Sequence, residues 1–264
     1  MYRVKKASSL LSFLKEKTGL SGRGIKKALE NGGCHVNGKL ERFGATSLKV
    51  GDAVTFRVPK EHNKEPFKIL YQDNDLTFFN KPSGEGSTPL QGHYLVHRLD
   101  KGTSGVLLMA RTLPMKKELE ALFKKREVKK TYIALIKGTP RKEGGTIRSF
   151  LTKKGSFHGQ TLYGSAPHGQ EAVTHWKVLK KMKGITLVEL HPETGRTHQL
   201  RVHLKEMGHP ILGDLQYGRE ETFPIEIDRL SLHAYRLSFI HPKTGKRIQV
   251  TAPLPLLFKP QQVV

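Results

Sequence analysis

The chain has 264 residues, and 36% of them are hydrophobic, which is enough for a packed core and argues against wholesale disorder. Its single cysteine, Cys34, excludes a disulfide within the chain and a cysteine-based zinc site. No apolar run approaches the roughly 18 residues of a membrane helix, and the first residues lack the apolar stretch of a secretory signal. We therefore expect a cytoplasmic protein that does not engage a membrane.

The net charge is the strongest bulk feature. The chain has 46 Lys and Arg residues against 23 Asp and Glu residues, for a net charge of +23. Such a field attracts polyanions and opposes self-association, so we expect a monomer with a nucleic-acid partner. A merely basic protein or a binder of anionic membranes would share this charge, but no basic amphipathic anchor or lipidation signal is present.

Residues 1–60 have the pattern of a small α+β module. Helical spacing predicts two short helices, carried by Leu10, Leu11 and Leu14 and then by Ile25, Ala28 and Leu29. The second helix ends at Asn31-Gly-Gly33, because glycine tolerates a left-handed cap. Asn37-Gly38 between short apolar runs predicts a two-residue hairpin turn. Alternation of Val54, Phe56 and Val58 predicts a closing strand.

This front segment resembles the alpha-L RNA-binding module of the ribosomal-protein-S-four type. The resemblance rests on the helix-loop-helix, Gly33, Val36-Asn37-Gly38 and Gly51-Asp52. It implies that a basic face of the helix pair and hairpin holds structured RNA. The side chains expected to do so are Arg23, Lys26, Lys27 and Lys39. The alternative is a small basic cap on the larger domain.

A polar segment bracketed by Pro59 and Pro66 is typical of a linker. We predict the module at 1–60, the linker at 61–67 and a large domain at 68–264. In the large domain, strand patterns occur at 75–79, 106–109, 131–136, 172–180, 185–190, 235–240 and 247–252, and helical stripes at 115–123 and 200–207. Many strands with few helices between them predict an α+β fold with a mostly antiparallel mixed sheet.

The segment His97-Arg-Leu-Asp-Lys-Gly-Thr-Ser-Gly105 places a carboxylate in a turn just before the strand at 106–109. Asp100 would be both accessible and rigidly held, which a nucleophile or a base requires. An Asp beside Gly, Thr and Ser is also a common turn or capping residue, so this segment alone leaves both interpretations open.

Two further segments contain candidate site residues. Arg201 lies beside the apolar helix face of Leu200 and Leu204, so it could be half-buried and would then need a carboxylate partner; a surface arginine is the alternative. We predict that Thr197 caps this helix. Tyr132 lies in a strand, either as an ordinary core tyrosine or as a platform for a flipped base.

Together these segments resemble the RluA-type family of pseudouridine synthases over residues 68–252. The resemblance is carried, in order, by Asn80-Lys-Pro-Ser-Gly84, His97–Gly105, Lys130-Thr-Tyr132, Gly195-Arg-Thr-His-Gln-Leu-Arg201 and Gly208–Gly218. It implies that Asp100 is the catalytic aspartate, that Arg201 pairs with it and that Tyr132 stacks on the target uracil. It implies that Arg98 enters the RNA helix where the base leaves. We also assign RNA or base contacts to His97, Arg196 and His198.

The resemblance implies an RNA pseudouridine synthase that needs no cofactor and no metal. We expect ribosomal RNA as the substrate, with transfer RNA left open. Asp100 could attack the sugar, attack the ring or remove a sugar proton. One rival interpretation is an inert RNA chaperone. Another is a metal-dependent nuclease, although His198 and His203 are five positions apart rather than the four of a helical metal pair.

Overall fold

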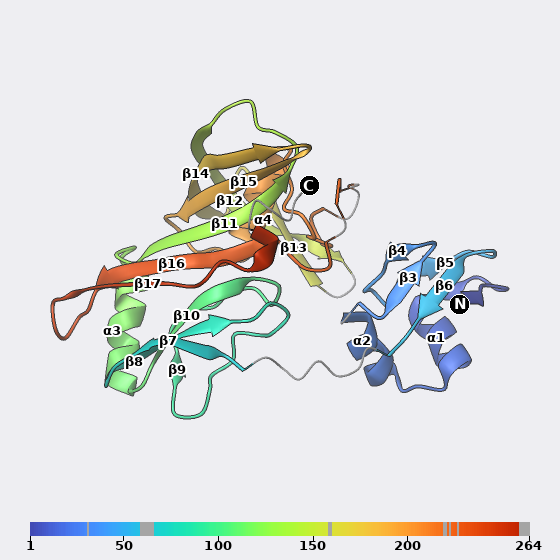
Figure 1. Cartoon of the computed structure of the whole chain (residues 1–264), viewed down its shortest axis with the longest axis horizontal. Coiled ribbons are helices and arrows are strands. Elements are labelled where there is room, and N and C mark those ends of the chain that lie inside the picture. The colour runs from blue at the N-terminus through green and yellow to red at the C-terminus, as the bar shows by residue number, and fades with distance from the viewer. Residues whose placement is uncertain are drawn as a thin grey trace. The chain divides into compact units, whose positions relative to one another are not determined.

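The computed structural model describes residues 1–30, 32–58, 66–157, 160–218, 221, 223–225 and 227–258. The chain divides into two compact units (Figure 1). The N-terminal unit holds Met1–Lys64 with Ser156–Gln160, and the large unit holds Glu65–Gly155 with Thr161–Val264. Residues 61–65 of the predicted linker lie outside the described residues. None of the helices in the described part of the chain is long and apolar enough to span a bilayer.

The N-terminal unit combines two helices with short strands. The helices are α1 (Leu10–Thr18) and α2 (Gly22–Glu30). A four-stranded sheet has the order β1-β6-β3-β4, and β2 pairs with β5. The strands are β1 (Tyr2–Arg3), β2 (Ser8–Ser9), β3 (Cys34–Val36), β4 (Lys39–Leu40), β5 (Ser47–Leu48) and β6 (Ala53–Phe56). Both predicted helices are confirmed, whereas the strand predicted to reach Val58 ends at Phe56.

Local sequence accounts for these elements. The Ser9 side chain accepts a hydrogen bond from the Ser12 N–H at the start of α1, and Gly19 ends the helix with φ 68°. Asn37 and Gly38 join β3 to β4 with φ 51° and 79°, the two positive values that a type I′ hairpin requires. The apolar faces of both helices pack on the sheet. The core consists of Val4, Leu10, Phe13, Leu14, Ile25, Leu29, Cys34, Leu48 and Val54.

The large unit is built on one 11-stranded sheet. Its main path has the order β13-β12-β14-β15-β11-β16-β10-β8-β7, with β17 paired to β16 and β9 paired to β10. The strands are β7 (Lys68–Gln72), β8 (Leu76–Lys81), β9 (Tyr94–Leu95), β10 (Ser104–Ala110), β11 (Lys129–Lys137), β12 (Gly144–Phe157), β13 (Gln160–Ala166), β14 (Gln170–Met182), β15 (Ile185–Pro192), β16 (Leu232–Ile240) and β17 (Arg247–Thr251). The helices are α3 (Leu113–Lys124), α4 (Gln199–Glu206) and the 3-10 turn η1 (Leu256–Phe258).

One parallel pairing joins two parts of this sheet that are far apart in the sequence. β10 runs parallel to β16, with Gly105 opposite Ala234, while β8–β10, β11–β16 and β14–β15 are antiparallel. Gly105 has φ 108°, and a Cβ there would lie 2.2 Å from the Ala234 carbonyl oxygen. Only glycine fits this close approach, so the end of the 97–105 segment is held against β16.

The core surrounds the sheet and gives the site a rigid base. All seven residues of β10 are buried, as the continuous apolar run at 106–109 predicts. Met115 and Leu119 of α3 pack in the cluster that contains Leu108, while Leu200 and Leu204 of α4 pack in the cluster that contains Trp176 and Val188. The sheet-rich α+β class is therefore confirmed. Strands β12 and β13 were not predicted, because residues 144–166 contain five glycines and no clean apolar alternation.

Candidate active site

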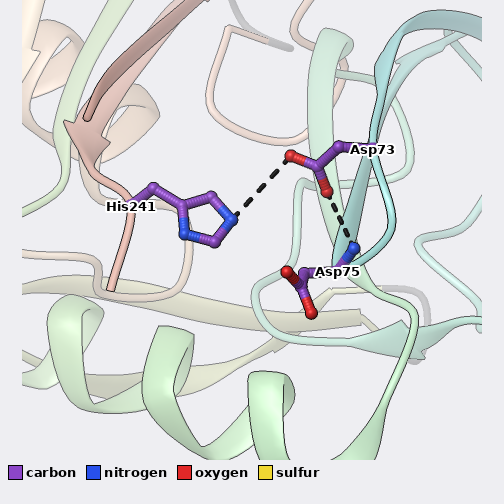
Figure 2. A group of neighbouring side chains, drawn as sticks. All are labelled: Asp73, Asp75 and His241. Atoms are coloured by element: carbon purple, nitrogen blue, oxygen red, sulfur yellow. Dashed lines mark hydrogen bonds and ion pairs between the residues drawn. The ribbon is translucent and has the colours of Figure 1, made fainter. Parts of the chain in front are cut away.

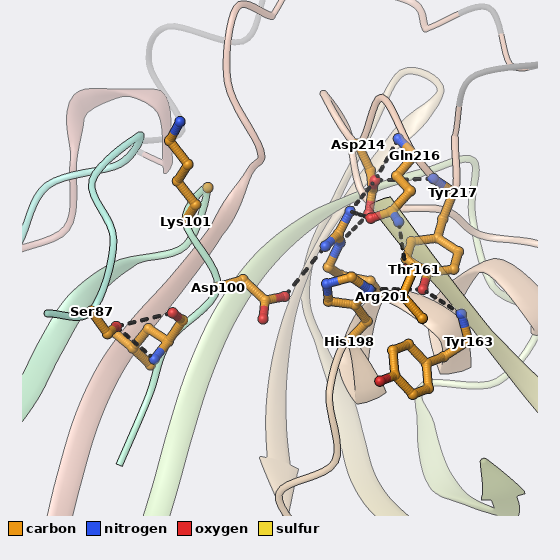
Figure 3. Close-up of polar contacts among 12 residues, drawn as sticks. Ser87, Asp100, Lys101, Thr161, Tyr163, His198, Arg201, Asp214, Gln216 and Tyr217 are labelled. Carbon is orange, nitrogen blue, oxygen red and sulfur yellow. Dashed lines mark hydrogen bonds and ion pairs between the residues drawn. The ribbon is translucent and has the colours of Figure 1, made fainter. Parts of the chain in front are cut away.

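Asp100 and Arg201 meet, although 101 positions separate them in the sequence. Asp100 lies in the loop between β9 and β10, and Arg201 lies in the first turn of α4. Arg201 Nη1 is 3.4 Å from Asp100 Oδ2, and the two side chains are 11% and 27% exposed (Figure 3). Tyr132 on β11 is half-buried, and burial followed by the charge of Asp100 raises the pKa of its phenol. The structure thus places Asp100 in contact with Arg201 and within electrostatic range of Tyr132.

The loop that carries Asp100 is fixed by its neighbours. Ser87 Oγ accepts from the Leu99 N–H at 2.9 Å and donates to the Leu99 carbonyl at 3.0 Å, as Figure 3 shows. The Thr103 N–H donates to the Asp100 carbonyl at 3.0 Å. Backbone bonds on both sides of Asp100 therefore set the position from which its carboxylate points.

Lys81, at the end of β8, stabilises the same loop by hydrogen bonds. Its side chain is fully buried, and its ammonium donates to the carbonyls of Pro82 (2.9 Å), Glu85 (2.7 Å) and Lys101 (3.3 Å). Burial lowers the pKa of Lys81 to about 8, so the ammonium keeps its charge at neutral pH. The segment Asn80-Lys-Pro-Ser-Gly84 thereby has a positioning role, which the sequence interpretation did not assign.

The main partner of Arg201 is Asp214, not Asp100. Arg201 Nε donates to Asp214 Oδ2 at 2.7 Å, and Nη2 donates to Asp214 Oδ1 at 2.8 Å and to Gln216 Oε1 at 2.9 Å. The prediction that Arg201 is half-buried and needs a carboxylate is correct, but the nearer carboxylate is a different one. Asp214 belongs to the Gly208–Gly218 segment, where an Asp after a glycine has the appearance of a turn residue.

One aromatic ring, that of Tyr217, lies against the guanidinium and is held by its own neighbours. The Arg201 Cζ atom lies 4.9 Å from the centre of the Tyr217 ring. The Tyr217 hydroxyl accepts from the Tyr163 N–H at 3.0 Å and bonds His198 Nδ1 at 2.8 Å. Burial, then the charge of Arg201, lowers the pKa of His198. The missed strand β13 therefore contributes Tyr163 to the site.

The start of α4 differs from the prediction. The N-cap is His198, in the left-handed conformation with φ 58° and without a side-chain capping bond, so the predicted cap by Thr197 is wrong. A buried network fixes this turn instead. Gln199 Nε2 donates to the Val173 carbonyl at 3.0 Å, and the Thr194 hydroxyl donates to Gln199 Oε1 at 2.6 Å. Packing against β14 outweighs the local capping preference.

The remaining predicted contacts fall into two groups. Arg98 is exposed beside Asp100, and Arg196 is half-buried, with Nε donating to the Glu171 carbonyl at 2.9 Å. His97 instead braces the sheet, because its Nε2 accepts from the Leu108 N–H at 2.9 Å and its ring stacks on Phe123 at 4.8 Å. Burial lowers the pKa of His97 to about 3, so the ring stays neutral. RNA contacts by these residues stay predictions.

A second cluster of side chains, Asp73, Asp75 and His241, has ligand atoms within 4.8 Å of one another (Figure 2). Internal contacts account for this group. His241 Nδ1 accepts from the Lys243 N–H at 3.1 Å and Nε2 faces Asp73 at 3.8 Å, while the Lys243 ammonium is 3.1 Å from Asp75. The cluster ties the β7–β8 turn to the loop between β16 and β17. His203, which the metal-dependent nuclease interpretation involved, is buried and forms hydrogen bonds with Thr174 and Ser149.

Comparison with known proteins shows what this chain is similar to. The family model described as RNA pseudouridylate synthase matches residues 72–206. Ribosomal large subunit pseudouridine synthase D of Vibrio cholerae is 32% identical, over 90% of this chain and 85% of its own length. Ribosomal large subunit pseudouridine synthase C of Buchnera aphidicola is 37% identical, over 72% and 68%.

Solved structures extend the likeness to the fold. Human RNA pseudouridylate synthase domain containing 4 has a TM-score of 0.61 and 28% identity, covering 72% of this chain and 89% of that one. Human RNA pseudouridylate synthase domain containing 1 has a TM-score of 0.63, also at 28% identity, covering 74% and 86%. The family model, the relatives and the solved structures agree, and the chain belongs to the RNA pseudouridylate synthase family.

Proposed function

We propose that this protein isomerises uridine to pseudouridine in structured RNA, that its substrate is ribosomal RNA, and that it acts as a monomer with Asp100 as the catalytic group. The observation that carries the proposal is the contact between the partly exposed Asp100 and the nearly buried Arg201. A carboxylate that a nucleotide can reach, on a rigid loop beside a guanidinium, suits attack or proton removal. The ribosomal large subunit names of the relatives support the choice of RNA.

The reaction itself can be carried out with few catalytic groups. It breaks the bond from the ribose to the uracil nitrogen, turns the ring and joins the ribose to carbon 5, while one proton leaves carbon 5 and one is gained at the nitrogen. Substrate and product have the same atoms, so the chemistry itself requires no redox carrier and no cosubstrate. Attack on the sugar, attack on the ring and removal of a sugar proton all use a single carboxylate, the role proposed for Asp100.

The target base must leave its stack before Asp100 can reach it. Flipping a base costs on the order of a few kcal/mol. Stacking on an aromatic side chain contributes about 1–3 kcal/mol per base, which Tyr132 would supply. Arg98, exposed two residues before Asp100, would fill the space that the base vacates. These two contacts would together offset the cost of extrusion.

Product analysis tests the proposed function. The protein is incubated with uridine-labelled transcripts of large-subunit ribosomal RNA and, separately, of transfer RNA, and pseudouridine is then mapped. We expect pseudouridine at discrete positions of the ribosomal transcript. Modification of transfer RNA alone would contradict the substrate class, and binding of both RNAs without any pseudouridine would support the inert chaperone instead.

We further propose that the N-terminal unit holds RNA by its phosphates. Arg23, Lys26 and Lys27 of α2 line a surface depression together with Lys15 of α1. Lys39 is exposed on β4 of the same unit. Contacts of this kind give affinity and register but little sequence information. The unit would therefore place the RNA and leave the choice of base to the large unit.

The salt dependence of binding tests this role. In the full chain, Arg23→Gln with Lys26→Gln should weaken RNA binding and reduce the slope of log K against log salt by about 1 for each lost phosphate contact. Lys5→Gln with Lys6→Gln removes the same charge from exposed positions of the same unit and is the matched control. Binding isotherms between 50 and 200 mM salt, a range in which such contacts are resolved, would measure both. Equal slopes for the two variants would refute an RNA-binding face on α2.

A further inference from the structure

We propose that Asp214 is a positioning residue that sets the orientation of the Arg201 guanidinium, and thereby keeps Asp100 free to react. This inference rests on the proposed role of Asp100. Nothing in the resemblance or the comparisons assigns a role to Asp214. Figure 3 shows it on the side of the guanidinium away from Asp100.

The hydrogen bonds of the guanidinium are divided unequally. Two short bonds, from Nε at 2.7 Å and Nη2 at 2.8 Å, go to the two oxygens of Asp214 as a fork. The second Nη2 proton goes to Gln216 Oε1 at 2.9 Å. Only Nη1 faces Asp100, at 3.4 Å. A forked pair with Asp100 would occupy both oxygens of the reacting carboxylate, and Asp214 prevents this by occupying the fork.

Asp214 is built to stay ionised in this role. Its side chain is 1% exposed. Burial alone would raise the pKa of Asp214, but the charge and hydrogen bonds of Arg201, with the N–H groups of Tyr217 and Gln216, lower it below its ordinary value. Asp214 Oδ1 accepts from both of these N–H groups at 3.0 Å. The carboxylate is therefore a fixed negative charge against Arg201.

The backbone around Asp214 is equally constrained. Gly213 has φ 72°, and a Cβ there would lie 1.9 Å from the Arg229 carbonyl oxygen, so this turn has one conformation. On the other side, Gln216 Nε2 donates to the Thr161 carbonyl on β13 at 2.9 Å. Asp214 and Gln216, which bind the Arg201 guanidinium, are thus anchored to two separate segments of the large unit. This gives them the rigidity that a positioning role needs.

The cluster has few charged and titratable groups, so the direction in which a charge change shifts the pH profile can be predicted. Arg201 faces Asp100, Asp214, His198 and Tyr217, while Tyr132 and Lys81 interact electrostatically with Asp100. Removing the negative charge of Asp214 favours the ionised form of the remaining carboxylate, since like charges no longer oppose it. Adding a carboxylate beside Arg201 has the opposite effect.

The first test is Asp214→Asn, with the pH profile of kcat as the readout. We expect kcat to fall by about 10²-fold, because the guanidinium is free to turn onto Asp100 and misplace it. We expect the acid limb of the profile to move to lower pH by about one unit. The RNA dissociation constant should change less than about twofold, since the side chain of Asp214 is buried. An acid limb in its parental position, or a parental kcat, overturns the inference.

A second variant keeps the inference testable if Asp214→Asn does not fold. Gln216→Glu keeps the Asp214 carboxylate and adds a second carboxylate at Nη2, although it loses the bond from Gln216 Nε2 to the Thr161 carbonyl. The acid limb should therefore move to higher pH, opposite to Asp214→Asn. A residue needed only for folding would alter the amplitude of the profile without moving it in either direction. If Asp100→Asn is inactive and both variants keep the parental limb, this inference alone is wrong; an active Asp100→Asn would refute the proposed function itself.

Discussion

Asp100→Asn should form pseudouridine at least about 10⁴-fold more slowly than the parent, while its RNA affinity stays within about twofold. Asparagine has nearly the shape of aspartate and can still accept a hydrogen bond from Arg201, but it is neither a nucleophile nor a base. The bonds of Ser87 to Leu99 and of Lys81 to the Lys101 carbonyl do not involve the Asp100 side chain, so the loop should keep its conformation.

Tritium release from uridine-labelled RNA measures the rate, and a filter-binding or fluorescence titration measures affinity. Asp75→Asn is the matched control, because it removes the same charge from a carboxylate that pairs with Lys243 outside the site. The control should keep parental activity. Activity of Asp100→Asn within tenfold of the parent would rule out the proposed role of this residue.

Arg201→Met should destabilise the protein by about 3–5 kcal/mol as well as inactivate it, because it leaves Asp214 as an uncompensated buried charge. The side chain of Asp214 is 1% exposed, and its two oxygens take the shortest bonds of the guanidinium. Methionine has a similar length and fills the space, so the loss of the ion pair dominates over the loss of packing.

The double variant Arg201→Met with Asp214→Asn separates stability from catalysis. Asparagine can still accept from the N–H groups of Gln216 and Tyr217 but carries no charge, so most of the lost stability should return. Activity should not return, because no guanidinium faces Asp100. Urea unfolding of both single variants and the double variant gives the coupling free energy. A single variant Arg201→Met that unfolds within about 1 kcal/mol of the parent would contradict the buried ion pair.

Short-range patterns were sufficient where neighbours in the sequence are also neighbours in space. The Asn37-Gly38 turn follows from the two positive φ values that only a few residues accept. The apolar run at 106–109 predicted a strand buried on both faces, which β10 is. Asp100, Tyr132 and Arg201 were identified because each lies in a distinctive segment, and the order of those segments matched one family.

Long-range contacts decided the rest. A glycine-containing stretch at 144–157 became the longest strand, because β14 provides a partner for it over eight residue pairs, from Gly144 opposite Lys177 to Leu151 opposite Gln170. His198 replaced Thr197 as the N-cap of α4, since the buried bonds of Gln199 to β14 fix the turn. Neither outcome has a signal within the segment itself.

The sequence by itself determined the family and the net charge of +23, and it predicted Asp100 as the catalytic carboxylate. Only the tertiary structure revealed that Arg201 is shared between two carboxylates and that the nearer one is Asp214, 13 positions along the chain. The physical reason is that a guanidinium has five donors in a rigid fork, and which acceptors lie within 3 Å depends on how α4, the β9–β10 loop and the segment after Gly213 converge.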